Sequence, residues 1–212
     1  MPLQNRVLPT QDIVADTGRG LLMGNRGTLH GPDRTLGVTR WRSKAWITCV
    51  LKWKGVQRDP MPPGRWTALF FLDEATALAA GHRPCAYCRR ADFNRYGACW
   101  AAAAGLPERP RAAAMDARLH DERVDRRTRR QRITTGTVGE LPDGAMVRYD
   151  GRPALVLGGE LLDWSWQGYG PARAIAAGTL VDVLTPAANR AVLQAGYVPL
   201  LHPTAMAQIR ST

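Results

Sequence analysis

The sequence predicts an α+β protein, in which a small α/β N-terminal region is followed by a basic helix and then by a small β-rich C-terminal module. Three observations predict this order: alternating apolar residues near residue 50, helix-start and helix-stop signals between residues 73 and 131, and hairpin dipeptides in the last third. A chain of 212 residues is long enough to bury a sizeable core. We expect boundaries that give regions 1–105, 106–135 and 136–212.

The first region begins with three expected strands. The turn signals Gly24-Asn25 and Gly31-Pro32 bound a short strand that ends at His30. Apolar and polar residues alternate within 42–54, which is typical of a strand with one buried face. A third, apolar strand is expected over residues 66–72.

Helices are expected next. Asp73 is a suitable N-cap for a short helix over Glu74–Ala80, and Gly81 suits the position after its end. A second helix is expected over residues 89–104 and a third, highly charged one over residues 112–131.

The last third changes to short strands, expected at 145–149, 152–157, 161–166 and 179–184. The dipeptides Asp150-Gly151 and Gly158-Gly159 between the first three are typical of tight hairpins. A short helix is expected to begin at Pro186.

The charge is strongly positive and unevenly distributed. The formal net charge is +11, and residues 1–135 hold 24 basic and 12 acidic residues against 5 and 6 in residues 136–212. Such an excess in one part of the chain predicts a polyanionic partner, most often nucleic acid. A hydrophobic content of 45% argues against disorder, and the sequence holds no apolar run of membrane-spanning length. The first 17 residues do not read as a secretory signal, so we expect a cytoplasmic protein.

The strongest chemical signal is Cys85-Ala-Tyr-Cys88, a C-x-x-C pair expected at a turn that opens into a helix. Two thiolates at this spacing can bind one Zn²⁺, and neighbouring arginines favour the thiolate form. A thioredoxin-like redox pair and two inert buried cysteines are the alternatives. Zinc needs further ligands, and Cys49 and His30 are the favoured ones. The other candidates are Cys99, His82 and His120.

A resemblance supports this interpretation. The segment from Phe70 to Arg89, with its aromatic strand, Ala-rich helix and Gly-His-Arg-Pro-Cys-x-x-Cys run, resembles the zinc-binding domain of the Ada DNA-repair family. Gly24-Asn25 followed by His30 is similar to relatives of that domain, so the likeness covers residues 24–92. It implies a zinc site and a link to DNA repair.

The sequence departs from the Ada pattern at the first two ligands, because His30 and Cys49 lie far apart and the family's first pair is closely spaced. In that family a zinc-bound cysteine accepts a methyl group from a DNA phosphotriester, and Cys49 is the position that would correspond. The motif match does not extend far enough to assign that activity. The chain as a whole also looks like a bacterial protein family, a likeness that implies no particular activity.

Arginines crowd the end of the expected third helix, and no acidic residue lies between residues 126 and 132. A guanidinium cluster of this kind can neutralise several phosphates. The alternative is a solvated helix with weak i,i+4 ion pairs. The residues expected to contact phosphate are Arg126, Arg127, Arg129, Arg130, Arg132, Arg89 and Arg90.

Two further patterns leave alternatives open. Trp41, Trp46, Trp53 and Trp66 alternate with basic residues, which is compatible with base stacking or with ordinary core packing. His120-Asp-Glu122 and Pro84-Cys-x-x-Cys88 together contain the residue types of a zinc nucleobase deaminase, although in reversed order.

The sequence therefore predicts a zinc-stabilised nucleic-acid-binding protein, with DNA favoured, in which the zinc is structural. The alternatives are a zinc enzyme acting on nucleic acid or a nucleobase, by deaminase-like or methyl-transfer chemistry, and a protein-interaction module.

Overall fold

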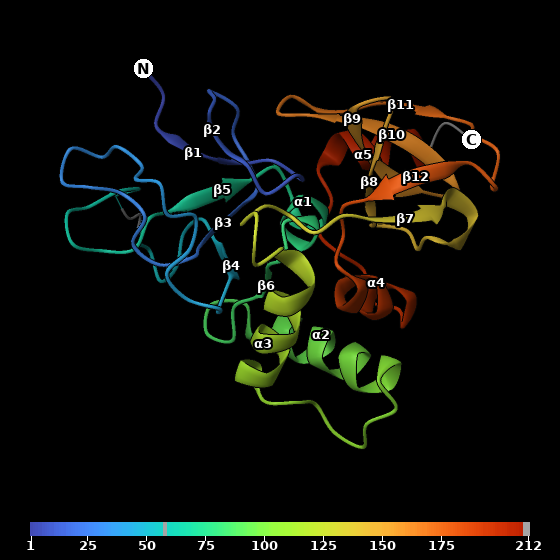
Figure 1. Ribbon diagram of the computed structural model, residues 1–212, viewed down its shortest axis with the longest axis horizontal. Helices are drawn as coiled ribbons and strands as arrows, with labels where there is room; N and C mark the ends of the chain where they lie inside the picture. Colours follow the sequence, from blue (N-terminus) through green and yellow to red (C-terminus); the bar gives the residue numbers. More distant parts are fainter. Residues whose placement is uncertain (57–58, 210–212) are drawn as a thin grey trace.

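The computed structural model describes residues 1–56 and 59–209; residues 57–58 and 210–212 of the regions expected above lie outside this description. The predicted α+β class is confirmed, with five helices and two six-stranded sheets in the described part. In Figure 1 the two sheets lie at the upper left and upper right, with α1 between them and α2, α3 and α4 below. Within the described ranges, no helix is both long enough and apolar enough to cross a bilayer.

The first sheet has the order β2-β1-β5-β3-β4-β6, and the second has the order β11-β10-β9-β8-β12-β7. The strands of the first sheet are β1 (Gln4–Val7), β2 (Ile13–Ala15), β3 (Leu22–Asn25), β4 (Ile47–Val50), β5 (Leu69–Phe71) and β6 (Arg83–Pro84). The strands of the second are β7 (Thr134–Thr137), β8 (Met146–Tyr149), β9 (Arg152–Leu157), β10 (Glu160–Ser165), β11 (Gly168–Arg173) and β12 (Leu180–Val183). The helices are α1 (Glu74–Ala79), α2 (Arg90–Ala103), α3 (Ala112–Arg123), α4 (Ala187–Gln194) and α5 (Pro203–Ile209), with a 3₁₀ turn at Val138–Glu140.

The central strand of the first sheet, β3, pairs antiparallel with both β4 and β5. Gly24 allows this close packing, because a Cβ at that position would lie 2.1 Å from the backbone oxygen of Ile47. At the edge, β4 pairs parallel with the short β6, so that Thr48 lies beside Pro84. This long-range pairing places the C-x-x-C segment against β4.

The second sheet confirms the predicted hairpins. Strands β8, β9, β10 and β11 form consecutive antiparallel pairs. The turn residues Asp150, Gly151, Gly158 and Gly159 all have positive φ angles, between 49° and 77°. That conformation is required by a type I′ turn, which explains the dipeptides.

The helix predictions hold except at one end. Asp73 caps α1 as predicted, because its carboxylate accepts hydrogen bonds from the Thr76 amide and hydroxyl. The third helix was expected to reach residue 131, but α3 ends at Arg123. Val124 then pairs with Gln131 in an isolated bridge, so the intervening residues form a hairpin-like loop. Asp125 accepts three hydrogen bonds from the following turn, the local pattern that competes with helix.

Strands β1, β2, β6, β7 and β11 and helix α5 were not predicted, and the strand expected to end at His30 lies earlier in the chain, as β3 at Leu22–Asn25. Gly or Pro interrupts β7 and β11, and the other unpredicted elements are short, so the sequence shows little periodicity there.

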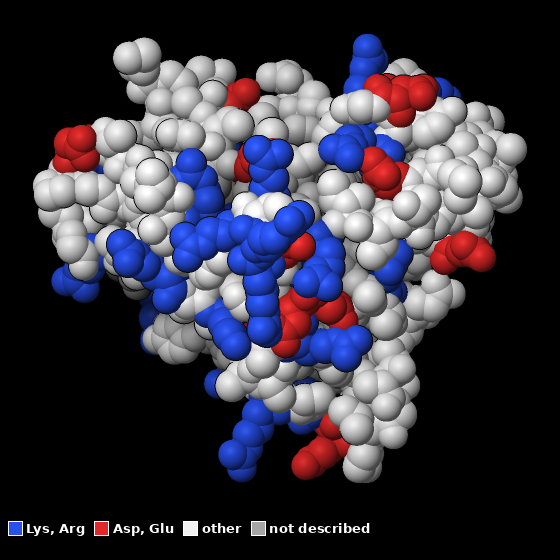
Figure 2. Space-filling model, in the orientation of Figure 1, with Lys and Arg blue, Asp and Glu red and all other residues white. Residues whose placement is uncertain are grey.

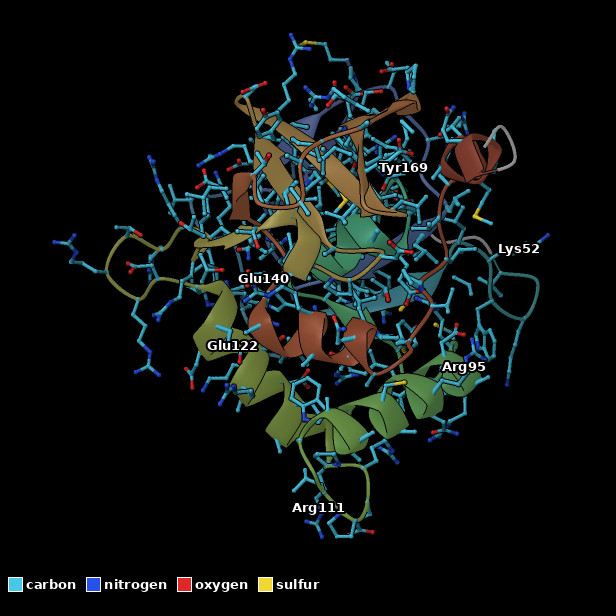
Figure 3. All side chains as sticks on the ribbon, turned by 90° about the vertical axis from the view of Figure 1, so that its right-hand side faces the viewer. Lys52, Arg95, Arg111, Glu122, Glu140 and Tyr169 are labelled. Carbon is cyan, nitrogen blue, oxygen red and sulfur yellow. The ribbon has the colours of Figure 1, made fainter. Side chains whose placement is uncertain are left out.

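The buried apolar residues form three clusters, one of which joins first-sheet residues such as Val7 and Phe71 to Ala77 of α1. Another cluster joins α2 and α3 to the second sheet and α4 through residues such as Phe93, Tyr96 and Leu119. The third cluster joins Leu72 and Ala75, around the start of α1, to the second sheet. The helices α2, α3 and α4 thus pack together beneath that sheet (Figure 3).

Two buried carboxylates at the start of α1 connect distant parts of the chain. Asp73 accepts hydrogen bonds from the Tyr169 hydroxyl at 2.8 Å and the His202 amide at 3.0 Å. Glu74 accepts from the Tyr197 hydroxyl at 2.7 Å, from the Leu200 amide and from Arg89 Nη2 at 2.9 Å. Both carboxylates therefore fix the C-terminal segment against the first region.

The Arg89–Glu74 ion pair is fully buried, with side-chain exposures of 4% and 2%. We expect Arg89→Met to lower the free energy of unfolding by about 3 kcal/mol, because it leaves the Glu74 carboxylate buried without its cation. Urea denaturation followed by circular dichroism measures the change.

The matched control is Arg95→Met, which removes another arginine that pairs with Asp92 (labelled Arg95 in Figure 3). Arg95 is 63% exposed, so its loss should cost less than about 1 kcal/mol. Equal effects of the two substitutions would contradict a structural role for the Arg89 pair.

Candidate metal centre and arginine-rich face

Three cysteines meet at the edge of the first sheet. Cys49 lies on β4, Cys85 directly follows β6, and Cys88 lies just before α2. Their Sγ atoms all lie within 4.8 Å of one another. None of the three is in a disulfide, so the group could hold a metal ion.

The backbone around these cysteines is held by two buried side chains, Thr48 and Arg89. The Thr48 carbonyl accepts a hydrogen bond from the Cys85 amide at 2.8 Å, and its hydroxyl donates to the Arg83 carbonyl at 3.2 Å. Arg89, which directly follows Cys88, donates from Nη1 to the Thr48 hydroxyl at 3.0 Å. Because Thr48 precedes Cys49, these bonds fix all three cysteine positions relative to one another.

The thiols also perturb one another's protonation. Hydrogen bonding to the Cys85 and Cys88 sulfurs, followed by burial, raises the pKa of Cys49. Hydrogen bonds from Cys49 and Cys88 lower the pKa of Cys85, so it is the first of the three to ionise. Three adjacent thiolates would repel one another, and a divalent cation removes that repulsion by ligating all of them.

A small cavity of about 190 Å³ adjoins the three sulfurs. Its wall is mainly apolar, with Met23, Trp53 and Trp66 among the lining residues. A tetrahedral metal held by these three cysteines would need one further ligand, and the adjoining cavity could admit it.

His30, the fourth expected ligand, is not part of the cysteine group in the described residues. Its Nδ1 lies 2.6 Å from the Thr67 hydroxyl, and its Nε2 lies 3.2 Å from the Pro62 carbonyl. These contacts occupy both ring nitrogens, so the structure brings Cys49 to the C-x-x-C pair and keeps His30 in a separate hydrogen-bonded position.

The remaining candidate ligands also lie apart from the sulfurs. Cys99 is half-buried on α2 against the core. His82 is buried against Phe71 and Trp46, and His120 packs against Trp41.

The parts of the deaminase-like pattern do not meet, because His120 is not among the grouped metal ligands. Glu122 accepts a hydrogen bond from the Ala188 amide at 2.7 Å, near the start of α4, and pairs with Arg118. The structure therefore gives Glu122 a role in fixing α4 and does not place it beside the cysteines.

Of the arginines expected to contact phosphate, all but Arg89 are exposed. Those between residues 126 and 132 are exposed on the loop between α3 and β7. In the view of Figure 2, Lys and Arg side chains gather over the middle of the molecule, with a few acidic groups among them. We call this surface, together with the exposed arginines of residues 126–132, the arginine-rich face. Arg126 pairs with Asp121, and Arg90 is exposed at the start of α2.

Arg89 differs from the expectation. It is 6% exposed, and its guanidinium donates to Glu74, Asp92 and Thr48. Burial alone would lower its pKa, but Glu74 outweighs burial and raises it. Its donors are occupied inside the protein, so it is not available to a phosphate.

Two other arginines are buried without a carboxylate, which the sequence did not predict. Among the described residues, neither Arg26 nor Arg123 forms a salt bridge, and their Cζ atoms lie 4.0 and 3.8 Å from the centre of the Trp46 ring. Arg26 donates to His82 Nε2 and to the Gln11 carbonyl; Arg123 donates to two backbone carbonyls.

Burial lowers the pKa of each of these guanidinium groups, and in Arg123 the value falls to about 9. Burial, followed by the charges of Arg26 and Arg123, also lowers the pKa of His82 well below its usual value. The imidazole is therefore neutral, and its Nε2 can accept the hydrogen bond from Arg26. Sequence reasoning missed this cluster because buried arginines are rare.

Comparison with known proteins found no protein-family model, curated protein or solved structure that matches the chain.

Proposed function

We propose that this protein is a zinc-stabilised nucleic-acid-binding protein. The observation that carries the proposal is the meeting of Cys49, Cys85 and Cys88 in the same part of the molecule that carries the excess of arginine. In this proposal the metal fixes the first sheet, and the arginine-rich face binds the phosphate backbone.

The choice of zinc rests on the donor set. Three sulfur ligands favour a soft or borderline metal and disfavour calcium and magnesium, which prefer oxygen. Zinc suits a tetrahedral site of this kind and supplies structural cross-linking without redox chemistry. Cys49, Cys85 and Cys88 would hold it, and Thr48 and Arg89 keep these ligands in place.

The choice of nucleic acid rests on the charge and its arrangement. The loop between α3 and β7 presents Arg127, Arg129, Arg130 and Arg132 with no ion pair to a described carboxylate. Exposed, unpaired guanidinium groups release counterions when they meet phosphates, which drives association. DNA is the favoured polymer because of the resemblance of residues 24–92 to a DNA-repair domain.

A second candidate function is a zinc enzyme that acts on nucleic acid or a nucleobase. The cavity of about 190 Å³ beside the sulfurs favours it, because catalytic zinc sites combine three protein ligands with an accessible fourth position. Zinc bound there would act as a Lewis acid.

The metal proposal predicts about one zinc per chain in protein purified without chelator. Cys85→Ser and Cys49→Ser should each lower the zinc content to well below half, because two sulfurs do not complete the site. Elemental analysis by plasma mass spectrometry measures the content.

Cys99→Ser is the matched control, because Cys99 lies on α2 and is not part of the sulfur group. It should retain full zinc content. Wild-type protein with no bound metal, and full stability after chelator treatment, would contradict the metal centre.

The nucleic-acid proposal predicts that binding to a short duplex weakens steeply as salt rises. The double substitution Arg127→Ala/Arg132→Ala should reduce the slope of log K against log salt by about 2, since each lost phosphate contact removes about 0.9. Fluorescence anisotropy between 50 and 200 mM salt measures both slopes.

Arg111→Ala/Arg152→Ala removes the same charge from positions away from this loop: Arg111 lies in the connection between α2 and α3, as Figure 3 shows, and Arg152 begins β9. This control should retain the wild-type slope. If affinity does not depend on salt, or both double variants behave alike, the loop is not the phosphate contact.

A further inference from the structure

The arginine-rich face contains a cavity that the metal centre does not use. It has a volume of about 520 Å³, within the range of small-molecule sites. Five arginines line it: Arg26, Arg40, Arg129, Arg130 and Arg148. The one carboxylate among the lining residues is that of Asp12.

The positive charge of this cavity is poorly compensated inside the protein. Arg26 is 1% exposed, forms no ion pair with a described carboxylate, and leaves its buried Nη2 without a hydrogen-bond partner. Arg123 lies against the same Trp46 ring and also has no carboxylate partner in the described part of the chain. Asp12 and Asp116 offset part of these charges without forming an ion pair. A bound anion in the cavity would supply the direct counter-charge that stabilises a buried cation.

The mouth of the cavity adds free donors. No side-chain hydrogen bond or ion pair of Arg129 or Arg130 occurs among the described residues, and Arg129 lies 5.9 Å from the Trp41 ring centre. Arg148 differs, because it pairs with Asp182 at 2.7 Å. The loop that the charge pattern had already singled out thus supplies two of the cavity's arginines.

An aromatic surface lies beside these cations. Trp41 is half-buried and lines the cavity. It also lines a second hollow of about 400 Å³, together with Arg40, Arg129 and Lys44. A planar ring next to phosphate-binding arginines is the combination that holds a nucleotide by base stacking and charge.

We propose that this cavity binds one nucleotide unit, with its phosphate held by Arg26, Arg129 and Arg130 and its base stacked on Trp41. This proposal rests on the proposed function, because it takes from it that the ligand is a nucleic acid. The preferred occupant is an unpaired nucleotide within a nucleic-acid strand. A free mononucleotide carries the same base and phosphate and is the other possible occupant. The adjoining hollow lined by Lys44 then receives the neighbouring phosphate.

The first test uses the full-length, metal-loaded protein and measures its melting temperature with AMP, dAMP or inorganic phosphate. A nucleotide at a hundredfold excess over its Kd should raise the melting temperature by about 5 °C or more. Inorganic phosphate should give a smaller rise. Trp41→Leu and Arg130→Ala should each reduce the nucleotide shift by more than half.

Arg111→Ala is the matched control, because Arg111 lies in the connection between α2 and α3 and does not line the cavity. Its nucleotide shift should equal that of the wild type. Circular dichroism establishes that each variant is folded, and Arg130→Ala changes an exposed side chain, so it tests the cavity even if Trp41→Leu destabilises the protein.

The second test compares a single-stranded 12-nucleotide DNA with its duplex. Trp41→Leu should weaken single-strand binding about tenfold, the usual scale of one lost stacking contact, and leave duplex binding within twofold. If the free nucleotides and phosphate give no shift but single-strand binding depends on Trp41, the occupant is a unit of a strand, which supports the proposal.

The outcomes that overturn the inference differ from those that overturn nucleic-acid binding. If DNA binds but Trp41→Leu changes neither DNA affinity nor the nucleotide shift, the cavity proposal is wrong and the proposed function stands. Equal shifts with phosphate and AMP overturn the stacking contact. If neither DNA nor nucleotide binds at 50 mM salt, both proposals are wrong.

Discussion

The contacts of a single buried arginine determine how the first region is assembled. Arg89 follows Cys88, donates to the hydroxyl of Thr48 next to Cys49, and forms a buried ion pair with Glu74 at the start of α1. Because Glu74 also accepts hydrogen bonds from Tyr197 and Leu200, the same arginine connects the cysteine cluster to the C-terminal segment. The sequence suggested that the Arg89 guanidinium contacts a phosphate, but it pairs with Glu74 inside the fold, and this carboxylate offsets the cost of burying the charge.

Arg26 and Arg123 differ from Arg89 in the groups that surround their buried charges. Arg89 has its carboxylate, and its pKa is raised; the other two have a tryptophan ring and neutral acceptors, and burial lowers their pKa values. Cation–π contact with Trp46 recovers part of the desolvation cost. Gly81 also contributes, because a Cβ there would lie 2.3 Å from the Arg123 side chain, which could then not reach the carbonyl of residue 81. Folding therefore maintains a cluster of positive charge that forms no direct ion pair with a described carboxylate, although Asp12 and Asp116 offset part of it from a distance.

Local patterns in the sequence predicted much of this structure and missed its long-range parts. The Asp73 cap, the Asp150-Gly151 turn and helix α2 follow from contacts within a few residues, so they could be predicted. The grouping of Cys49 with Cys85 depends on the parallel pairing of β4 and β6, and sequence reasoning reached it only as one option among several ligands. His30 is not among the grouped residues, and sequence alone could not show this because its partners, Thr67 and Pro62, come from distant segments. The burial of Arg26 and Arg123 could not be predicted from the sequence, because arginine is usually exposed at the surface.

The cysteine centre and the arginine cavity share one short stretch of chain, which makes them mechanically dependent on each other. Successive residues of a strand point to opposite faces, so Thr48 and Cys49 of β4 face opposite ways, and Trp46 directly precedes this strand. The Trp46 ring borders the cavity and the Cys49 sulfur belongs to the cluster. The Arg83 amide of β6 donates to the Trp46 carbonyl, and the Cys85 amide donates to the carbonyl of Thr48, which precedes Cys49. A metal that holds Cys49 to Cys85 and Cys88 would therefore fix the register of β4 against β6, and that register sets where Trp46 and its two arginines lie. Because charges held in fixed positions bind an anion without further ordering cost, the metal would act on the cavity by preorganising it, across the sheet and without touching the ligand.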